Sequence, residues 1–186
     1  KSRSIIAIGD SLTIGLWLPI EDNYPSQLEK KLNNVGYNYK IENAWISGDT
    51  SAWLLSRIDW ILDGVNPDFV ILCIGANDAF QWKTIEDIEK NIRSVIEKIQ
   101  AKNIRIVFAG MRAPFNLGGE YRSAYDSMFP RLAKEYKLDF VPFLLEGVAL
   151  NSKYNQDDRI HPNREWYAIV VDNIMKTLED SSLLKK

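Results

Sequence analysis

The sequence predicts an α/β fold in which one parallel sheet is covered by helices on both faces. Short apolar runs of strand length alternate with longer stretches of helical spacing, the order that builds parallel sheets. The apolar runs are continuous rather than alternating, for example Phe69 to Ile74, as expected of strands buried on both faces. A chain of 186 residues is long enough for one sizeable core, so a single domain over residues 1–186 is expected.

The expected strands are short runs rich in isoleucine, valine and phenylalanine, which favour an extended backbone. Turn-forming residues separate them from the helices, as in Asn66-Pro67-Asp68 before the third run. In chain order the five expected strands are Ile5–Ile8, Tyr39–Ala44, Phe69–Ile74, Ile104–Ala109 and Asp139–Phe143.

Helices are expected where apolar residues recur three or four positions apart. The clearest case has isoleucine at positions 85, 88, 92, 96 and 99, with opposite charges paired on its exposed side. Pro130 is expected to disturb another helix, and Trp53, Trp60 and Trp166 are expected to pack on helix faces. In chain order the five expected helices are Tyr24–Asn34, a helix capped within Asp49–Ser51 that runs to Leu62, Ile85–Ile99, Tyr121–Tyr136 and Arg164–Leu178.

Charge and hydropathy argue against several classes of partner. The formal net charge is -2 and there is no long basic run, so neither nucleic acid nor an anionic membrane is an expected partner. The longest apolar stretches have strand length, which predicts no integral membrane segment. Lys1-Ser2-Arg3 leads directly into the first strand without the features of a signal peptide. A soluble protein is expected, and its compartment is left open.

The counts of cysteine and histidine narrow the chemistry. Cys73 is the single cysteine, which excludes an intramolecular disulfide, and its apolar surroundings predict a buried side chain. His161 is the single histidine, which excludes the zinc sites that need two or three imidazoles from one chain. The sequence contains neither G-x-G-x-x-G nor G-x-x-x-x-G-K, the two glycine-rich motifs that bind phosphate. The main support for a nucleotide-binding protein is therefore missing. No metal and no cofactor are expected.

Four short motifs lie where strands are expected to end or loops to begin. Since the carboxyl ends of parallel strands share one edge of a sheet, side chains from these motifs can converge there. The fourth motif follows the fifth strand, so it can reach the same edge. In chain order the motifs are Gly9-Asp10-Ser11-Leu12, Asn43 to Thr50, Gly75-Ala76-Asn77-Asp78 and Asp157 to Asn163.

The residue types in these motifs suit nucleophilic catalysis. Ser11 needs an adjacent base, and His161 is the candidate with a near-neutral pKa. Asp158 can reach the imidazole and fix its tautomer, with Asp157 as its rival for that role.

Oxyanion donors are available in the same motifs. They are the backbone N–H groups of Ser11 and Gly48 and the side-chain amide of Asn77. Asp10 is expected to hydrogen-bond backbone near the serine, while Asp49 and Asp78 are expected to serve as a helix cap and a loop brace.

At these residues the sequence resembles the SGNH (GDSL) hydrolase family, whose four name-giving residues match Ser11, Gly48, Asn77 and His161. The family's acid lies three residues before the histidine, which matches Asp158. The resemblance runs nearly end to end and is closest to the bacterial branch of multifunctional thioesterases, lysophospholipases and arylesterases. It implies a three-layer α/β/α flavodoxin-like fold, a five-stranded parallel sheet of order 2-1-3-4-5, and a site without metal.

Two segments depart from the pattern of that branch. Trp45 and Ile46 stand where it usually has glycine and valine, and Ala79-Phe80-Gln81-Trp82 replaces its usual Gly-Leu-Arg continuation. Because the second segment forms a substrate loop in relatives, its changes put acyl preference in doubt. The residues expected to contact substrate are Trp45, Ala79, Phe80, Trp82 and Phe115.

The expected function is therefore a serine esterase that cleaves carboxylic esters or thioesters of arylester, acyl-CoA or lysophospholipid type through an acyl-enzyme. Its expected partner is a small-molecule or lipid-like ester, and the oligomeric state is open. The resemblance implies the bacterial cytoplasm, or the periplasm or exterior after removal of a signal. One alternative is a carbohydrate O-deacetylase of the same fold. Another is a catalytically silent binding domain, which would usually lack a triad member, and none is missing here.

Overall fold

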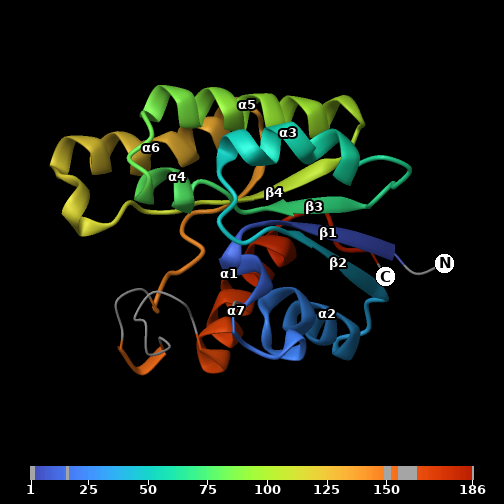
Figure 1. The fold of residues 1–186 in the computed structure, drawn as a ribbon. Helices are drawn as coiled ribbons and strands as arrows, with labels where there is room; N and C mark the ends of the chain where they lie inside the picture. Colours follow the sequence, from blue (N-terminus) through green and yellow to red (C-terminus); the bar gives the residue numbers. More distant parts are fainter. Residues whose placement is uncertain (1–2, 16, 149–151, 155–162, 186) are drawn as a thin grey trace.

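A parallel sheet organises the computed structural model, which describes residues 3–15, 17–148, 152–154 and 163–185 (Figure 1). Among these residues, five strands lie in the order β2-β1-β3-β4-β5, and all neighbouring pairs are parallel. The predicted order 2-1-3-4-5 is thus confirmed. The strands are β1 (Arg3–Gly9), β2 (Tyr39–Trp45), β3 (Phe69–Leu72), β4 (Arg105–Ala109) and β5 (Asp139–Val141).

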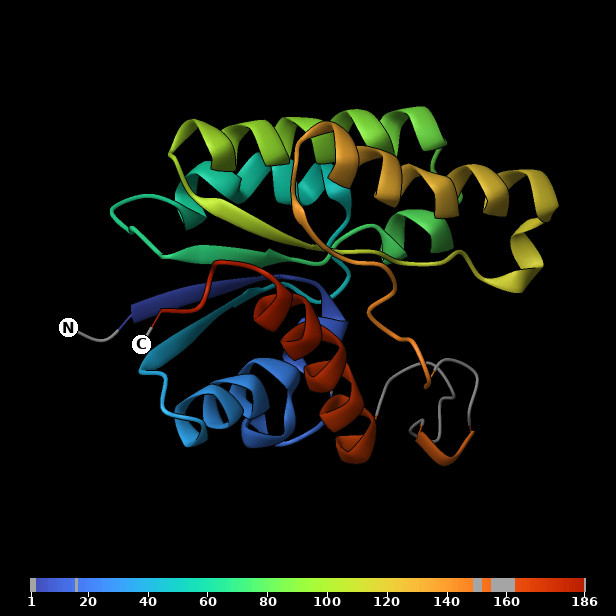
Figure 2. The same ribbon diagram turned by 180° about the vertical axis from the view of Figure 1, so that it is seen from behind.

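Helices cover both faces of the sheet and complete three layers, as Figures 1 and 2 show from opposite sides. Helices α3 (Ser51–Ile61), α5 (Ile85–Ala101) and α6 (Gly119–Glu135) lie on one face. Helices α2 (Tyr24–Asn34) and α7 (Arg164–Asp180) lie on the other. The three-layer α/β/α prediction is confirmed. None of the helices within the described residues is long and apolar enough to cross a membrane.

The main elements form where local sequence and burial agree. All four residues of β3 are buried, as a central strand with helices on both faces requires. In α5 the apolar stripe turns toward the core and buries Ile88, Ile92 and Ile96 completely. Thr84 caps the start of α5 by accepting a hydrogen bond from the backbone N–H of Asp87. Helix α6 continues through Pro130, which is exposed, so the expected disturbance does not end the helix.

Short helices at the ends of strands escaped the sequence prediction. Helix α1 (Ser11–Ile14) follows β1 after a single residue, and α4 (Ala76–Phe80) begins four residues after β3. Helices of four or five residues contain too few positions for an apolar period to be recognised. The 3₁₀ helices η1 (Ile20–Asp22), η2 (Phe115–Leu117) and η3 (Ser152–Tyr154) complete the described elements.

The expectation that three tryptophans pack on helix faces is wrong for two of them. Trp166 in α7 is buried, but Trp53 and Trp60 in α3 are 70% and 80% exposed. Positions 53 and 60 are seven residues apart, so they share one helix face. The opposite stripe, Leu54, Ile58 and Ile61, is buried. The spacing of apolar residues shows that a helix has an apolar face. Where a helix has two such faces, the spacing does not show which of them packs against the sheet.

Candidate active site

Ser11 is the first residue of α1, directly beyond the carboxyl end of β1. The chain packs closely at Gly9, the last residue of β1, where a β-carbon would lie 2.0 Å from Thr13 Oγ1 and 2.7 Å from the carbonyl oxygen of Cys73. Only glycine fits such a close approach. Asp10 then caps α1 by accepting a hydrogen bond from the Leu12 N–H at 3.0 Å. The predicted bond from Asp10 to nearby backbone is confirmed.

Gly48 lies in the turn that links β2 to α3. It is exposed and has a left-handed backbone, with φ of 78°. Behind it, buried Asp49 accepts hydrogen bonds from Arg57, at 2.8 Å from Nε, and Arg57 also reaches the carbonyl oxygen of Ala44. This ion pair ties the turn to the end of β2. The helix cap expected at Asp49 is instead Thr50, whose side chain accepts from the Trp53 N–H.

The Asn77 side chain connects the ends of three strands. It is the second residue of α4, and its Nδ2 donates to the carbonyl oxygen of Asp49 at 3.0 Å and to Asp10 Oδ2 at 3.3 Å. Asp10 follows β1, Asp49 follows β2 and Asn77 follows β3. The structure therefore brings together the three motifs that carry Ser11, Gly48 and Asn77.

Asp78 fixes the start of α3 from the neighbouring helix α4. Its carboxylate accepts from the backbone N–H of Ser51 at 2.8 Å and from the Ser51 hydroxyl at 2.6 Å. Asn91 of α5 donates to the same hydroxyl at 3.2 Å. The predicted bracing role of Asp78 is confirmed.

Asp10 is the most perturbed carboxyl group of this site. Its side chain is buried, and this loss of hydration raises its pKa to about 7, with smaller contributions from the negative charges of Asp49 and Asp78. The hydrogen bond from Leu12 acts in the opposite direction. Burial also raises the pKa values of Asp49 and Asp78. A negative charge at this site is therefore energetically unfavourable unless hydrogen-bond donors stabilise it.

The predicted base His161 and acid Asp158 lie outside the described residues, as does the rival acid Asp157. Their roles stay predictions. The structure does describe the two ends of that segment. Asn163 caps α7 by accepting from the Trp166 N–H at 3.1 Å, and its own backbone N–H donates to the Tyr154 carbonyl oxygen at 3.0 Å.

The residues expected to contact substrate fall into two groups. Trp45, the last residue of β2, is half-buried and pairs with Gly9, while Ala79 is buried within α4. Phe80, Trp82 and Phe115 are more than half exposed. Large apolar side chains therefore lie at the end of β2 and on the segments that follow β3 and β4.

Two features of this edge could not be read from the sequence. Arg57 carries no motif, and only the fold shows that it pairs with Asp49. The bond from Asn77 to Asp10 joins residues 67 positions apart. In the sequence, only the position of Asp10 next to Ser11 indicates that Asp10 takes part in such a bond.

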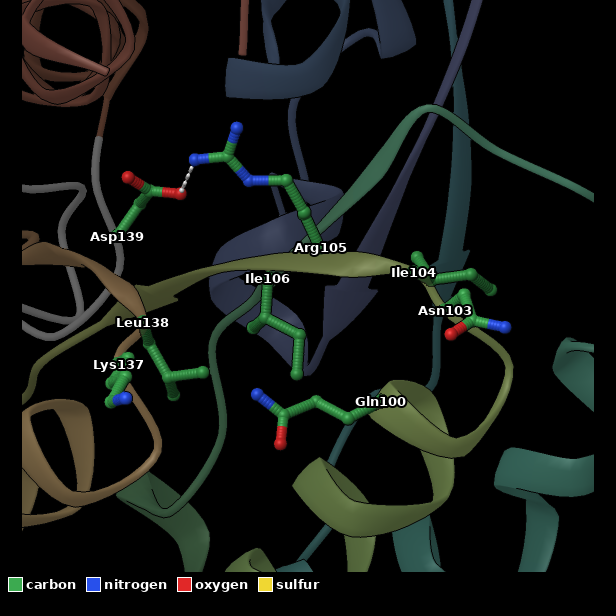
Figure 3. Close-up of a pocket in the computed structure, with 8 residues that line it drawn as sticks. All are labelled: Gln100, Asn103, Ile104, Arg105, Ile106, Lys137, Leu138 and Asp139. Atoms are coloured by element: carbon green, nitrogen blue, oxygen red, sulfur yellow. Dashed lines mark hydrogen bonds and ion pairs between the residues drawn. The ribbon is translucent and has the colours of Figure 1, made fainter. Parts of the chain in front are cut away.

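A cavity at the opposite edge of the sheet is not part of this site. Gln100, Ile104, Arg105 and Asp139 are among the residues that line it, at the amino ends of β4 and β5 (Figure 3). Arg105 donates to Asp139 at 2.8 Å across its rim. Within the part of the chain that the structure describes, no cluster of His, Cys, Asp and Glu could hold a metal ion.

Fold and site together define a class. The chain is a doubly wound α/β protein whose serine, turn glycine and asparagine follow three neighbouring strands, and Asn77 is bonded to the residues next to the other two. They lie at the carboxyl edge of the sheet, where proteins of this architecture place their ligands. The model of the GDSL-like lipase/acylhydrolase family matches residues 7–169, so the chain belongs to that family. The predicted membership and the prediction of an enzyme of this hydrolase family are both confirmed.

Proteins of known name are similar over nearly the whole chain. The arylesterase of Vibrio mimicus is 33% identical over 95% of this chain and 90% of its own. Thioesterase 1/protease 1/lysophospholipase L1 of Escherichia coli K12 is 31% identical over 95% of this chain and 83% of its own. The crystal structure of TesA superposes with a TM-score of 0.91 at 31% identity, covering 96% of this chain and 99% of the other.

Proposed function

We propose that the protein is a serine esterase that cleaves carboxylic esters or thioesters through a covalent acyl-enzyme. The observation that carries this proposal is the double hydrogen bond of Asn77, which joins the ends of the first three strands beside Ser11 and Gly48. A nucleophile and donors from three separate strands suit acyl transfer, in which an oxyanion develops next to the attacked carbon.

In the first half of the proposed reaction, the Ser11 hydroxyl attacks the acyl carbon and gives its proton to His161. Asp158 orients the imidazole and stabilises the imidazolium. The carbonyl oxygen becomes an oxyanion that accepts hydrogen bonds from the N–H groups of Ser11 and Gly48 and from Asn77. Collapse of the tetrahedral intermediate breaks the ester bond as His161 returns the proton to the leaving group.

In the second half, His161 takes a proton from water, and the resulting hydroxide attacks the acyl carbon of the ester on Ser11. The same donors hold the second oxyanion. Its collapse frees the acid, and the Ser11 oxygen regains its proton from His161. Each half is thus balanced in protons, and no metal or cofactor takes part.

The donor geometry of Asn77 suggests how it would reach the oxyanion. Both of its Nδ2 hydrogens already have acceptors, at 3.0 Å in Asp49 and 3.3 Å in Asp10. The longer bond is the weaker one. We therefore expect Asn77 to keep its bond to the Asp49 carbonyl oxygen and to exchange Asp10 for the oxyanion.

The names of the relatives support the proposed substrate class. They include an arylesterase and a protein named both thioesterase and lysophospholipase. The exposed Phe80, Trp82 and Phe115, on the segments that follow β3 and β4, would suit the apolar part of a small or lipid-like ester.

The test compares wild type, Ser11→Ala and the control Ser127→Ala, which changes an exposed serine of α6. Each is assayed with p-nitrophenyl esters of increasing chain length, an acyl-CoA, a lysophospholipid and acetylated xylan. We expect ester hydrolysis by wild type and the control, and a loss on the order of 10⁴–10⁶ in kcat for Ser11→Ala. Equal activity of wild type and Ser11→Ala would refute the proposal. Activity confined to acetylated xylan would refute the substrate class.

A further inference from the structure

Exposed apolar side chains follow each of the strands β1 to β4 at the edge that carries Ser11. Trp17 comes after α1, and Ile46 comes directly after β2. Phe80 ends α4 and Trp82 follows it, while Phe115 begins η2 after β4. Figure 1 shows α1 and α4 at the edge that lies away from the two chain termini. These five residues, here called the apolar rim, are between 48% and 70% exposed.

Two tryptophans of the rim adopt a backbone conformation that bulky residues rarely accept. Trp17 has φ of 66° and Trp82 has φ of 54°, both in the left-handed region. Trp17 lies in a turn closed by a bond from the Leu18 N–H to the Gly15 carbonyl oxygen at 2.9 Å. Glycine would fit both positions with less strain. Large aromatic side chains held there despite the strain indicate a use for their exposed surface.

Neighbouring side chains hold part of the rim in place. The ring of Trp82 lies 6.0 Å from that of Tyr121, whose hydroxyl donates to the Lys83 carbonyl oxygen at 2.7 Å. The Arg122 guanidinium stacks 4.3 Å above the ring of Phe115. These contacts order the aromatic groups yet leave more than half of the surface of Trp82 and Phe115 exposed. Little conformational entropy would be lost when the rim meets a partner.

We propose that the apolar rim inserts into the surface of aggregated lipid, so that the site takes its ester substrates from a vesicle or micelle. This inference rests on the proposed esterase function, because only an esterase would take its substrate from the lipid. Binding to vesicles can nevertheless be measured without esterase activity. The rim consists of separate apolar groups on segments that follow four strands, at the edge of the sheet that carries Ser11. A fluid lipid surface can receive such a set without a matching shape, and tryptophan favours the boundary between lipid and water.

The charged residues near the rim indicate which lipid headgroup charge it would bind. Lys83 and Arg112 are exposed and close in sequence to Trp82 and Phe115, and Arg122 stacks on Phe115. Glu21 and Glu120 are exposed and close in sequence to Trp17 and Phe115. Charges of both signs on a chain of net charge -2 give no preference for an anionic surface. We therefore expect the rim to bind zwitterionic phosphatidylcholine.

The chain offers a matched control for the rim. Trp60 is 80% exposed, more than any rim residue, and it occupies the last turn of α3, whereas Gly48 precedes the first turn of that helix. If exposed tryptophan alone caused lipid binding, Trp60 would contribute as much as Trp17. If the rim binds as a unit, Trp60 contributes nothing.

The experiment measures binding to sucrose-loaded vesicles of dioleoylphosphatidylcholine by sedimentation. The parent protein is Ser11→Ala, so that no lipid is hydrolysed. Trp17→Gly, Ile46→Ser and Trp60→Ala are each added to it. Glycine suits the left-handed backbone at position 17, and Ile46→Ser provides a second rim variant without that backbone feature. We expect the parent to bind, Trp17→Gly and Ile46→Ser each to lower the partition coefficient by roughly tenfold, and Trp60→Ala to leave it within about twofold.

A parent that does not sediment with vesicles would overturn the inference. Rim variants that bind as well as the parent, or an equal loss in Trp60→Ala, would also overturn it. Self-association of the parent without vesicle binding would likewise overturn it, by assigning the rim to a contact between copies. The proposed esterase function is tested separately, by hydrolysis of p-nitrophenyl acetate in water without vesicles. It fails if no hydrolysis that depends on Ser11 is found.

Discussion

At the scale of single residues, Asp10 has the most unusual environment near the candidate nucleophile. The carboxyl group is buried, accepts from Leu12 N–H and Asn77 Nδ2, and has two further carboxyl groups, Asp49 and Asp78, among its electrostatic neighbours. Burial raises the pKa values of Tyr24 and Tyr167, and the charge of Asp10 raises them further. With a pKa of about 7, this carboxyl group is neutral below pH 7 and becomes charged above it.

The substitution Asp10→Asn should therefore change how stability depends on pH. In the unfolded chain an aspartate has a pKa near 4, whereas in the native state the pKa of Asp10 is about 7. Between these values the native state keeps a proton that the unfolded state has released, so rising pH lowers stability, by up to about 4 kcal/mol. Asparagine cannot lose that proton.

Urea unfolding of wild type and Asp10→Asn at pH 5 and pH 8 measures the effect. Subtracting the free energy of unfolding of wild type from that of the variant removes the contribution of the titratable groups that both proteins contain. We expect the variant to gain stability relative to wild type as the pH rises. A difference that is independent of pH would show that Asp10 titrates normally in the native state.

Asn77 is the residue whose removal should separate catalysis from binding. Asn77→Ala deletes one proposed oxyanion donor, so we expect kcat for p-nitrophenyl acetate to fall by about 10²–10³ with little change in KM. Loss of the bonds to Asp10 and Asp49 should also lower the unfolding temperature. A large rise in KM with unchanged kcat would place Asn77 in substrate binding instead.

At the scale of elements, α4 ends in a Schellman motif with an unusual residue. The backbone N–H of Trp82 donates to the Ala79 carbonyl oxygen and that of Lys83 donates to Asp78, each at 3.0 Å. This motif places its left-handed residue where glycine is usual. Here that residue is Trp82, with φ of 54°.

A pair of substitutions at Trp82 isolates the backbone contribution. Both Trp82→Gly and Trp82→Ala remove the ring and its contact with Tyr121, but only glycine adopts the left-handed conformation without strain. We expect Trp82→Gly to exceed Trp82→Ala in free energy of unfolding by about 1 kcal/mol. The measurement is denaturant unfolding, and equal stabilities would show that the α4 terminus relaxes out of the motif.

Elements with a long apolar period could be predicted from the sequence, whereas short ones could not. Helix α2 has the predicted bounds Tyr24–Asn34, and α5 differs from its prediction only at its carboxyl end. Helices α1 and α4 were missed because four or five residues are too few to show an apolar period. In α3, two apolar faces competed, and the predicted position of Trp53 and Trp60 was wrong.

At the scale of the whole molecule, the sheet order explains why the site could be anticipated. Strands β2, β1 and β3 are neighbours, so the residues that follow them must meet at one edge. Alternating strands and helices predicted that edge, and the motifs supplied Ser11, Gly48 and Asn77. The hydrogen bonds among Asp10, Asp49 and Asn77 could not be predicted, because they depend on side-chain positions at the ends of separate strands.

One hydrophobic core includes residues from all five strands of the described chain and from the helices on both faces of the sheet. The predicted single domain should therefore unfold in one cooperative step. We expect urea transitions followed by tryptophan fluorescence and by far-ultraviolet circular dichroism to coincide, since the six tryptophans are spread from position 17 to position 166. Two separate transitions would indicate independently stable parts.

If Ser11 is an activated nucleophile, it reacts covalently with electrophiles that trap serine hydrolases. Wild type and Ser11→Ala are treated with a fluorophosphonate, and intact mass and peptide mapping locate the adduct. We predict one adduct on wild type, located on Ser11, and none on Ser11→Ala. An unlabelled wild type, or an adduct that persists in Ser11→Ala, would contradict the account.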